Sequence, residues 1–96
     1  MSLRFQWDPA KADANLRKHG VAFEEAITVF RNPLAAIFDD DQHSGDEARE
    51  IIVGHSQRRR LLIVIFVERG EFVRIVSART CTRREQSDYE EHLKQR

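Results

Sequence analysis

The feature that most constrains the fold is an unbroken apolar run, Leu61–Val67, with a hairpin-length break on each side. A strand that is apolar at every position is typical of the centre of a sheet, covered on both faces. The breaks, Gln57–Arg60 and Glu68–Glu71, are short enough to reverse the chain between antiparallel strands. With Arg49–Ser56 before the run and Glu71–Arg79 after it, the pattern predicts an antiparallel meander with Leu61–Val67 in the middle.

The first helix has clear signals at both ends. Asp8-Pro9 is typical of an N-cap followed by a first-turn proline, and Gly20 is typical of the left-handed residue that ends a helix. A helix is therefore predicted over Pro9–His19. The positions expected to form its inward stripe are Ala12, Asn15, Leu16 and His19.

Two further helices and two short strands complete the expected elements. A second helix is predicted over Phe23–Arg31 and ends before Pro33, and Thr82–Glu85 is a capping-box pattern that opens a third helix to about Gln95. The third helix carries few apolar residues, chiefly Tyr89 and Leu93, so we expect it to be loosely held or to await a partner. The short strands are expected at Phe5–Trp7 and Leu34–Phe38, with an acidic loop from Asp39 to Glu47.

The length and composition fit one α+β domain over residues 1–96, with an antiparallel sheet, two N-terminal helices and one C-terminal helix. No run of about 18 apolar residues is present, so no transmembrane helix is expected. A single cysteine, Cys81, cannot form an internal disulfide and is expected to be a small core residue. These features predict a cytoplasmic protein.

The formal net charge is zero, but the charge is unevenly distributed along the chain. Residues 1–50 hold 6 Lys+Arg against 10 Asp+Glu, whereas residues 51–96 hold 10 against 6. A local basic surface matters more to an anionic partner than the total does. Arginine supplies 13 of the 16 basic residues and suits bidentate phosphate contacts, although a GC-rich genome would also favour it.

The basic residues are densest between Arg74 and Arg84, at the end of one strand and the start of a helix. Such a stretch can grip phosphate, because helix N-termini also favour anions. Regular alternation along the strand places Arg74 and Arg79 on opposite faces, so they share a groove only if a bulge or the strand end turns one of them. The competing interpretation is a solvated charge run whose arginines pair with Glu85, Asp88 and Glu90.

Two other groups of residues have alternative explanations. Lys18 and His19 fall at a helix C-terminus, where the macrodipole stabilises cations, but His19 is on the predicted inward stripe with Asn15 and could meet a substrate. The four histidines follow no zinc-ligand spacing, and the Asp39–Asp41 cluster is expected to be a solvated loop rather than a cation site. We therefore expect no metal and no cofactor.

Taken together, the segments resemble the BrnT-like family of bacterial type II toxins. The resemblance covers nearly the whole chain in order. It departs from the family pattern at Ala22, where a serine cap is usual, and at Thr80-Cys81, where a basic residue and alanine are more common. The matching stretches are Phe5–Lys11, Asn15–Val21, Phe23–Ala26, Val29-Phe30, Arg49, Ile52–Gly54, Arg74–Arg79, Thr82–Glu85 and Tyr89-Glu90.

The resemblance implies a RelE-like fold and a toxin that is a metal-independent endoribonuclease and inhibits translation. It also implies neutralisation by a BrnA-like ribbon–helix–helix antitoxin, with DNA bound only by the toxin–antitoxin complex. The alternative is a non-catalytic interaction module whose basic face binds a partner protein. A DNA-binding regulator acting alone is disfavoured, since no recognition helix carries base-reading residues at groove spacing.

Cleavage by 2′-OH attack needs a base, cations for the phosphorane charge and an acid for the leaving 5′-oxygen. We assign phosphate binding to Arg49, Arg74 and Arg83, and transition-state stabilisation chiefly to Arg79. Lys18 or His19 is assigned to proton transfer. Tyr89 is assigned as an acid or as a base-stacking residue.

Overall fold

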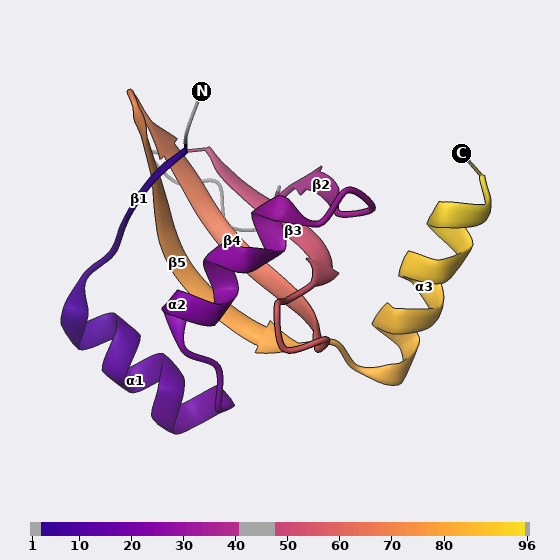
Figure 1. Cartoon of the computed structure of the whole chain (residues 1–96), viewed down its shortest axis with the longest axis horizontal. Coiled ribbons are helices and arrows are strands. Elements are labelled where there is room, and N and C mark those ends of the chain that lie inside the picture. Colours follow the sequence, from indigo (N-terminus) through magenta and orange to yellow (C-terminus); the bar gives the residue numbers. More distant parts are fainter. Residues whose placement is uncertain (1–2, 41–47, 96) are drawn as a thin grey trace.

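The computed structural model describes residues 3–40 and 48–95, so the expected loop beyond Asp40 lies largely outside the described residues. Five strands and three helices, one of them continued by a 3-10 turn, follow one another along the chain (Figure 1). In order they are β1 Arg4–Gln6, α1 Pro9–His19, α2 Phe23–Ala26, η1 Ile27–Arg31, β2 Ala36–Asp39, β3 Arg49–His55, β4 Leu61–Arg69, β5 Phe72–Thr80 and α3 Arg83–Lys94.

The strands form one sheet in the order β1-β5-β4-β3-β2, which confirms β4 as its central strand. The meander from β2 to β5 is antiparallel throughout, as predicted. The prediction of a fully antiparallel sheet is wrong in one respect: β1 pairs with β5 in parallel, so the sheet is mixed. From β1 at one edge the chain crosses through α1 and α2 to β2 at the other edge, and no hairpin fixes the direction of β1.

The local signals of α1 are confirmed at both ends. The Asp8 side chain accepts a hydrogen bond from the Ala10 N–H at 2.9 Å, and Gly20 has a φ of 70° and donates its N–H to the Leu16 carbonyl. The predicted stripe was too wide, since Leu16 is 49% exposed. Asn15 is buried, because the helix rests beside a strand edge rather than over the middle of the sheet.

The second predicted helix is present but changes type along its length. The four residues of α2 begin at Phe23 after Ala22, which provides no side-chain cap, and η1 continues as a 3-10 helix to Arg31. The Thr28 hydroxyl donates to the Glu25 carbonyl at 2.7 Å, and β-branched residues crowd the α-helical turn here.

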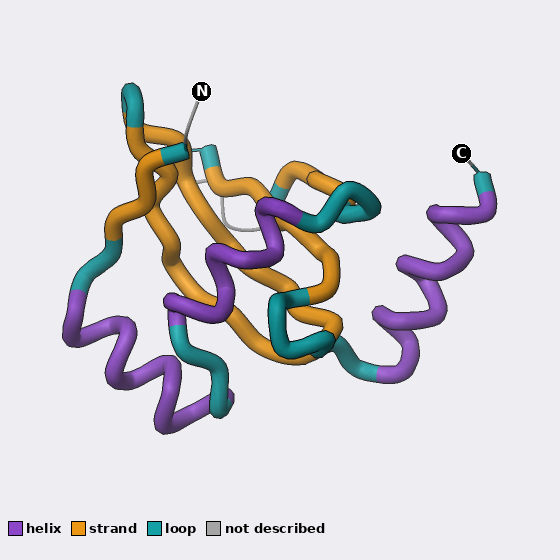
Figure 2. The backbone as a smooth tube through the Cα atoms, viewed as in Figure 1, coloured by secondary structure: helices purple, strands orange, loops and turns teal. Residues whose placement is uncertain are grey.

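The sheet separates two apolar clusters. Figure 2 shows the helices on both sides of the sheet, with α3 standing apart from α1 and α2. The larger cluster joins α1, α2 and η1 to one face through Phe23, Leu62 and Ile75, among others. The smaller one joins Tyr89 of α3 to the other face. Full burial of β4 on both faces is therefore not observed: Ile63 is only half-buried under α3.

The capping box of α3 is confirmed. The Thr82 hydroxyl accepts the Glu85 N–H at 3.2 Å, while the Glu85 carboxylate accepts the Thr82 N–H at 2.9 Å. The expectation of a loosely held helix also agrees with the packing, since Tyr89 is the only buried residue of α3.

Candidate nucleic-acid interface

A β-bulge in β5 decides which arginines share a face of the sheet. The register between β4 and β5 shifts midway along the pair, which leaves Val76 as an extra residue on β5. On either side of the shift, Arg74 lies opposite Val67 and Arg79 lies opposite Ile63. Ile63 and Val67 are four residues apart on β4 and point to the same face, so Arg74 and Arg79 also share a face. Regular alternation would have separated them.

Arg49 belongs to the same face. It lies opposite Val67 from the β3 side, whereas Arg74 lies opposite Val67 from the β5 side. Their backbones are two strand spacings apart, about 10 Å, and Arg79 lies about 13 Å farther along the strands. All three side chains are partly exposed. We call this side of the sheet, with Arg49, Arg74 and Arg79, the arginine face. Its three cations are too far apart to hold one phosphate and are spaced to contact separate phosphates of one strand.

Arg79 is held by an ion pair with the first turn of α3. Its Nη1 and Nη2 atoms donate to the two carboxylate oxygens of Glu85 at 2.7 and 2.8 Å. These bonds lower the pKa of Glu85 to about 2 and raise the pKa of Arg79. Glu85 is therefore a carboxylate at neutral pH and a weak base, and it fixes the direction of the Arg79 guanidinium.

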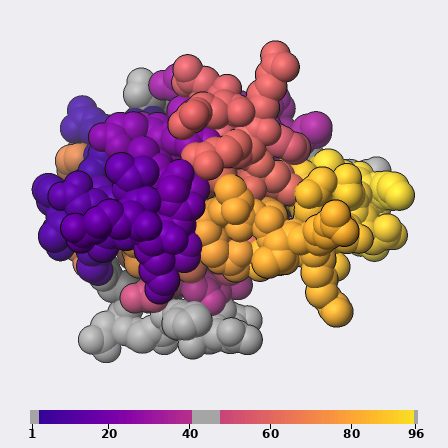
Figure 3. All heavy atoms as spheres, turned by 90° about the horizontal axis from the view of Figure 1, so that it is seen from below, coloured from indigo at the N-terminus to yellow at the C-terminus, as the bar shows by residue number. Residues whose placement is uncertain are grey.

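One end of the sheet gathers basic residues from four segments. Figure 3 shows the α1 and α2 region beside the end of β5 and the start of α3. The α1 end is joined to the β3–β4 turn by a bond from Arg60 Nη2 to the Gly20 carbonyl at 3.1 Å. We call this the basic end of the sheet. The basic residues of its four segments are Arg17, Lys18, Arg58, Arg59, Arg60, Arg79, Arg83 and Arg84.

A buried carboxylate holds the β3–β4 turn at the basic end. Glu25 on α2 accepts bonds from the guanidinium of Arg60 and, at 2.6 Å, from the Ser56 hydroxyl. The Arg60 hydrogen bond is the main reason that the pKa of Glu25 is lowered. Arg58 Nη1 also lies 4.0 Å from Glu25 Oε1, while the side chains of both Arg58 and Arg59 remain exposed at the surface.

Lys18 belongs to the basic end and His19 follows it, but neither residue is on the arginine face. They belong to α1, whose Ala12 packs in the larger apolar cluster on the opposite side of the sheet. The Asn15 amide donates to the Ala78 carbonyl at 2.8 Å and accepts the Ala78 N–H at 3.1 Å, so α1 lies along the part of the β5 edge that β1 does not cover. His19, one turn after Asn15, is half-buried, and Lys18 is exposed.

The structure does not favour the roles expected for Tyr89. Its ring is 4% exposed, and its hydroxyl donates to the Leu34 carbonyl at 2.7 Å. A buried ring cannot stack on an RNA base without movement of α3, and the phenol proton is already engaged. Tyr89 is a packing residue that holds α3 on the sheet.

Two residues next to Arg79 were not predicted from the sequence as part of the site: Ser77 on β5 and Glu85 on α3. Ser77 lies between Arg74 and Arg79 on β5, on the same side as Arg79, and is half-buried. Glu85 was interpreted only as a capping residue or a solvated counter-ion. Its spacing of six residues from Arg79, across a strand end and a capping box, was the available signal.

The other expectations concern metal binding, the cysteine and the membrane. Among residues 3–40 and 48–95, no group of three or more His, Cys, Asp or Glu side chains is arranged to hold a metal ion. Burial is the largest cause that raises the pKa of the Cys81 thiol, to about 11, so Cys81 is a neutral packing residue at pH 7. In the same described ranges, no helix is both long and apolar enough to cross a membrane.

These features define a small α+β protein with a mixed sheet, one face of which carries spaced arginines suited to an anionic polymer. The family model of the ribonuclease toxin BrnT of type II toxin–antitoxin systems matches residues 7–85, and the chain belongs to this family. None of the curated proteins matches it by sequence. A crystal structure of the Brucella abortus ribonuclease toxin BrnT is similar in fold, with a TM-score of 0.66 and 21% identity over 85% of this chain and 100% of the other.

Proposed function

We propose that this chain, as one toxin domain over residues 1–96 with a RelE-like fold, is a metal-independent endoribonuclease that inhibits translation. The observation that carries the proposal is the bulge at Val76, which brings Arg74 and Arg79 to the face of the sheet on which Arg49 also lies. Membership of a ribonuclease toxin family supports RNA as the anionic polymer. Spaced phosphate contacts hold a single strand extended, so that a ribose 2′-oxygen can reach the adjacent phosphorus.

The cleavage step moves two protons and breaks one bond. The 2′-oxygen attacks the adjacent phosphorus as a base removes its proton, and the 5′-oxygen leaves with a proton from an acid. Arg79 is suited to stabilise the negative charge of the phosphorane, because Glu85 orients its guanidinium in advance. Arg49, Arg74 and Arg83 hold neighbouring phosphates. Lys18 or His19 transfers protons for a strand that passes around the edge of β5 at the basic end.

We also propose that the chain acts in the cytoplasm with a BrnA-like ribbon–helix–helix antitoxin, and that only the complex of the two binds DNA. The type II toxin–antitoxin family supports an antitoxin partner. The charge distribution of α3 supports the second part of this proposal, since the exposed Asp88, Glu90 and Glu91 would repel the phosphates of a duplex.

The purified chain should cleave a defined single-stranded RNA in EDTA. Because Arg79 stabilises the transition state, Arg79→Ala should lower the cleavage rate by about 10²–10³-fold. Arg31→Ala is the matched control: this exposed arginine ends η1, on the other side of the sheet, and its loss should leave the rate unchanged. A wild-type chain that leaves RNA intact in EDTA would refute the proposal, and so would an active Arg79→Ala variant.

The alternative function is a non-catalytic module that binds a partner protein. One observation favours it: Glu85 already neutralises Arg79, as in an ordinary surface ion pair. Expression of the chain without an antitoxin distinguishes the ribonuclease from the non-catalytic module. Growth arrest with RNA fragmentation supports the enzyme, whereas harmless accumulation of folded protein supports the module.

A further inference from the structure

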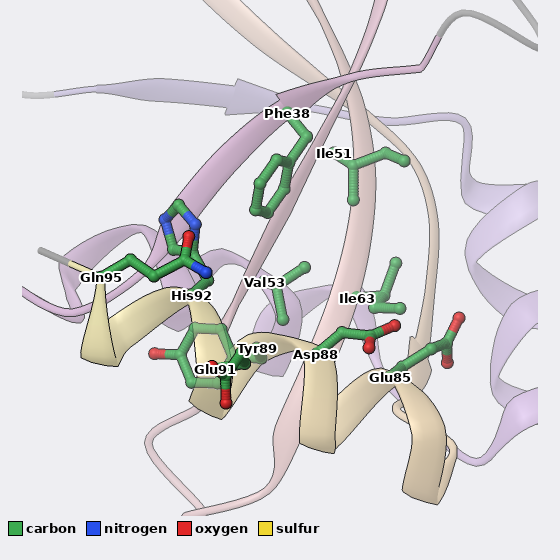
Figure 4. Close-up of a pocket in the computed structure, with 10 residues that line it drawn as sticks. All are labelled: Phe38, Ile51, Val53, Ile63, Glu85, Asp88, Tyr89, Glu91, His92 and Gln95. Atoms are coloured by element: carbon green, nitrogen blue, oxygen red, sulfur yellow. The ribbon is translucent and has the colours of Figure 1, made fainter.

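A groove lies between α3 and the sheet, on the same side as the arginine face and over β2, β3 and β4. Its volume is about 430 Å³. Figure 4 shows side chains of the sheet and of α3 pointing toward one another across it. The lining residues are Phe38, Ile51, Val53 and Ile63 from the strands and Glu85, Asp88, Tyr89, Glu91, His92 and Gln95 from α3.

The groove has an apolar floor and an acidic wall. Its floor comes from three adjacent strands, and its wall carries three carboxylates, while none of its ten lining residues is a lysine or an arginine. Glu85 is paired with Arg79, whereas Asp88 and Glu91 are exposed. RNA phosphate is repelled by such a wall, so the groove differs in ligand class from the arginine face beside it.

The dimensions favour a helix as the occupant. The floor spans the strands β2 to β4, about 10 Å, which is close to the diameter of an α-helix. A volume of about 430 Å³ is that of a small-molecule pocket, so it takes the anchoring side chains of a helix and not the helix itself. The apolar floor reaches the outer strand of the sheet, where Phe38 is 41% exposed.

We propose that this groove docks a helical segment of a partner protein that is apolar on one face and carries lysine or arginine along its flanks. Leucine-like side chains at i, i+3, i+4 and i+7 would lie over Ile51, Val53 and Ile63, and the flanking cations would pair with Asp88 and Glu91. The proposal does not depend on RNA cleavage. Only the identification of the partner as the antitoxin would rest on the proposed function.

The test uses a fluorescein-labelled 15-residue helical peptide of leucine and lysine, with leucine at the four anchor spacings, and measures its binding by fluorescence anisotropy. The wild-type chain should bind the peptide saturably, and the double variant Asp88→Lys/Glu91→Lys should bind at least about tenfold more weakly. Glu90→Lys is the matched control, since Glu90 is exposed on α3 but does not line the groove. Its affinity should change less than about twofold.

Two further measurements exclude non-specific charge attraction. Ile51→Ala should weaken the peptide several-fold without changing any charge, and circular dichroism confirms that each variant is folded. An unlabelled single-stranded RNA should not displace the peptide. Lack of saturable binding, equal weakening by Glu90→Lys, or displacement by RNA would overturn the proposal. None of these outcomes bears on whether the chain cleaves RNA.

Discussion

At Arg79, two hydrogen bonds to one carboxylate join the end of β5 to the first turn of α3. The same Glu85 carboxylate also closes the capping box with Thr82, so one side chain serves the helix start and the arginine face together. A guanidinium that is fixed before substrate binds loses little freedom when it meets a phosphate. Glu85 therefore connects the capping of α3 to the proposed role of Arg79.

The Glu85 carboxylate should make folding stability depend on acid. Its pKa falls from 4.5 to about 2 in the folded protein. The stabilisation is complete above pH 4.5 and is lost as the pH falls toward 2. In Glu85→Gln, which keeps a side chain able to cap, urea unfolding should show lower stability at pH 7 and a flatter dependence between pH 4.5 and 2. Glu90→Gln, on the exposed side of α3, should match the wild type.

Glu50 should make the folded protein less stable as the pH rises, which is the opposite of the effect of Glu85. Burial, a hydrogen bond with Glu68 and the charges of Glu68 and Asp39 raise the pKa of Glu50 above 4.5. The folded state then holds the proton more tightly than the unfolded chain, so stability declines as the pH rises from 4.5 through the raised pKa. Glu50→Gln should therefore raise the urea midpoint at pH 7, and Glu24→Gln, an exposed control on α2, should not. A lower midpoint for Glu50→Gln would contradict this account.

At the scale of elements, the sequence predicts the features that depend on residues close together in the chain. Asp8, Gly20 and Thr82 define helix ends through bonds within a few residues, and the apolar run of β4 identifies the central strand. The parallel pairing of β1 depends on a strand far along the chain, and the bulge at Val76 depends on how the whole of β5 pairs with β4, so no local pattern encodes either feature. The arginine residues could therefore be found from the sequence, but not the face that they share.

Asn15 provides the clearest contact between elements. Its amide makes three hydrogen bonds, one to the Val21 carbonyl at 2.9 Å and two to the backbone of Ala78. Asn15→Ala would leave these buried groups unpaired, so it should lower the free energy of unfolding by about 2–4 kcal/mol. Leu16→Ala, at an exposed neighbouring position, should cost less than about 0.5 kcal/mol. Similar costs for the two variants in urea titrations would show that Asn15 does not anchor α1.

At the scale of the whole molecule, the net charge is zero, but the two ends of the sheet differ in charge. The basic end gathers cations from α1, the β3–β4 turn, β5 and α3. At the opposite end of the sheet, Arg49 and Arg74 lie among carboxylates from four strand ends: Asp39, Glu50, Glu68 and Glu71. The charge imbalance between the two halves of the sequence indicated a polarised surface. The fold determines where the cations gather, because the end of β3, the start of β4 and the end of β5 lie side by side in the antiparallel sheet. Long-range attraction of RNA should therefore be strongest at the basic end, where Arg79 begins the arginine face that runs toward Arg49 and Arg74.

The central claim, that the arginine face binds RNA through separate phosphates, is tested most directly by the salt dependence of RNA affinity. For single strands the slope of log K against log salt is about −0.7 for each phosphate contact. Arg49→Ala, Arg74→Ala and Arg79→Ala should each reduce the slope by about 0.7, and the triple variant by about 2, while Arg31→Ala leaves it unchanged. A triple variant that keeps the wild-type slope would contradict the account.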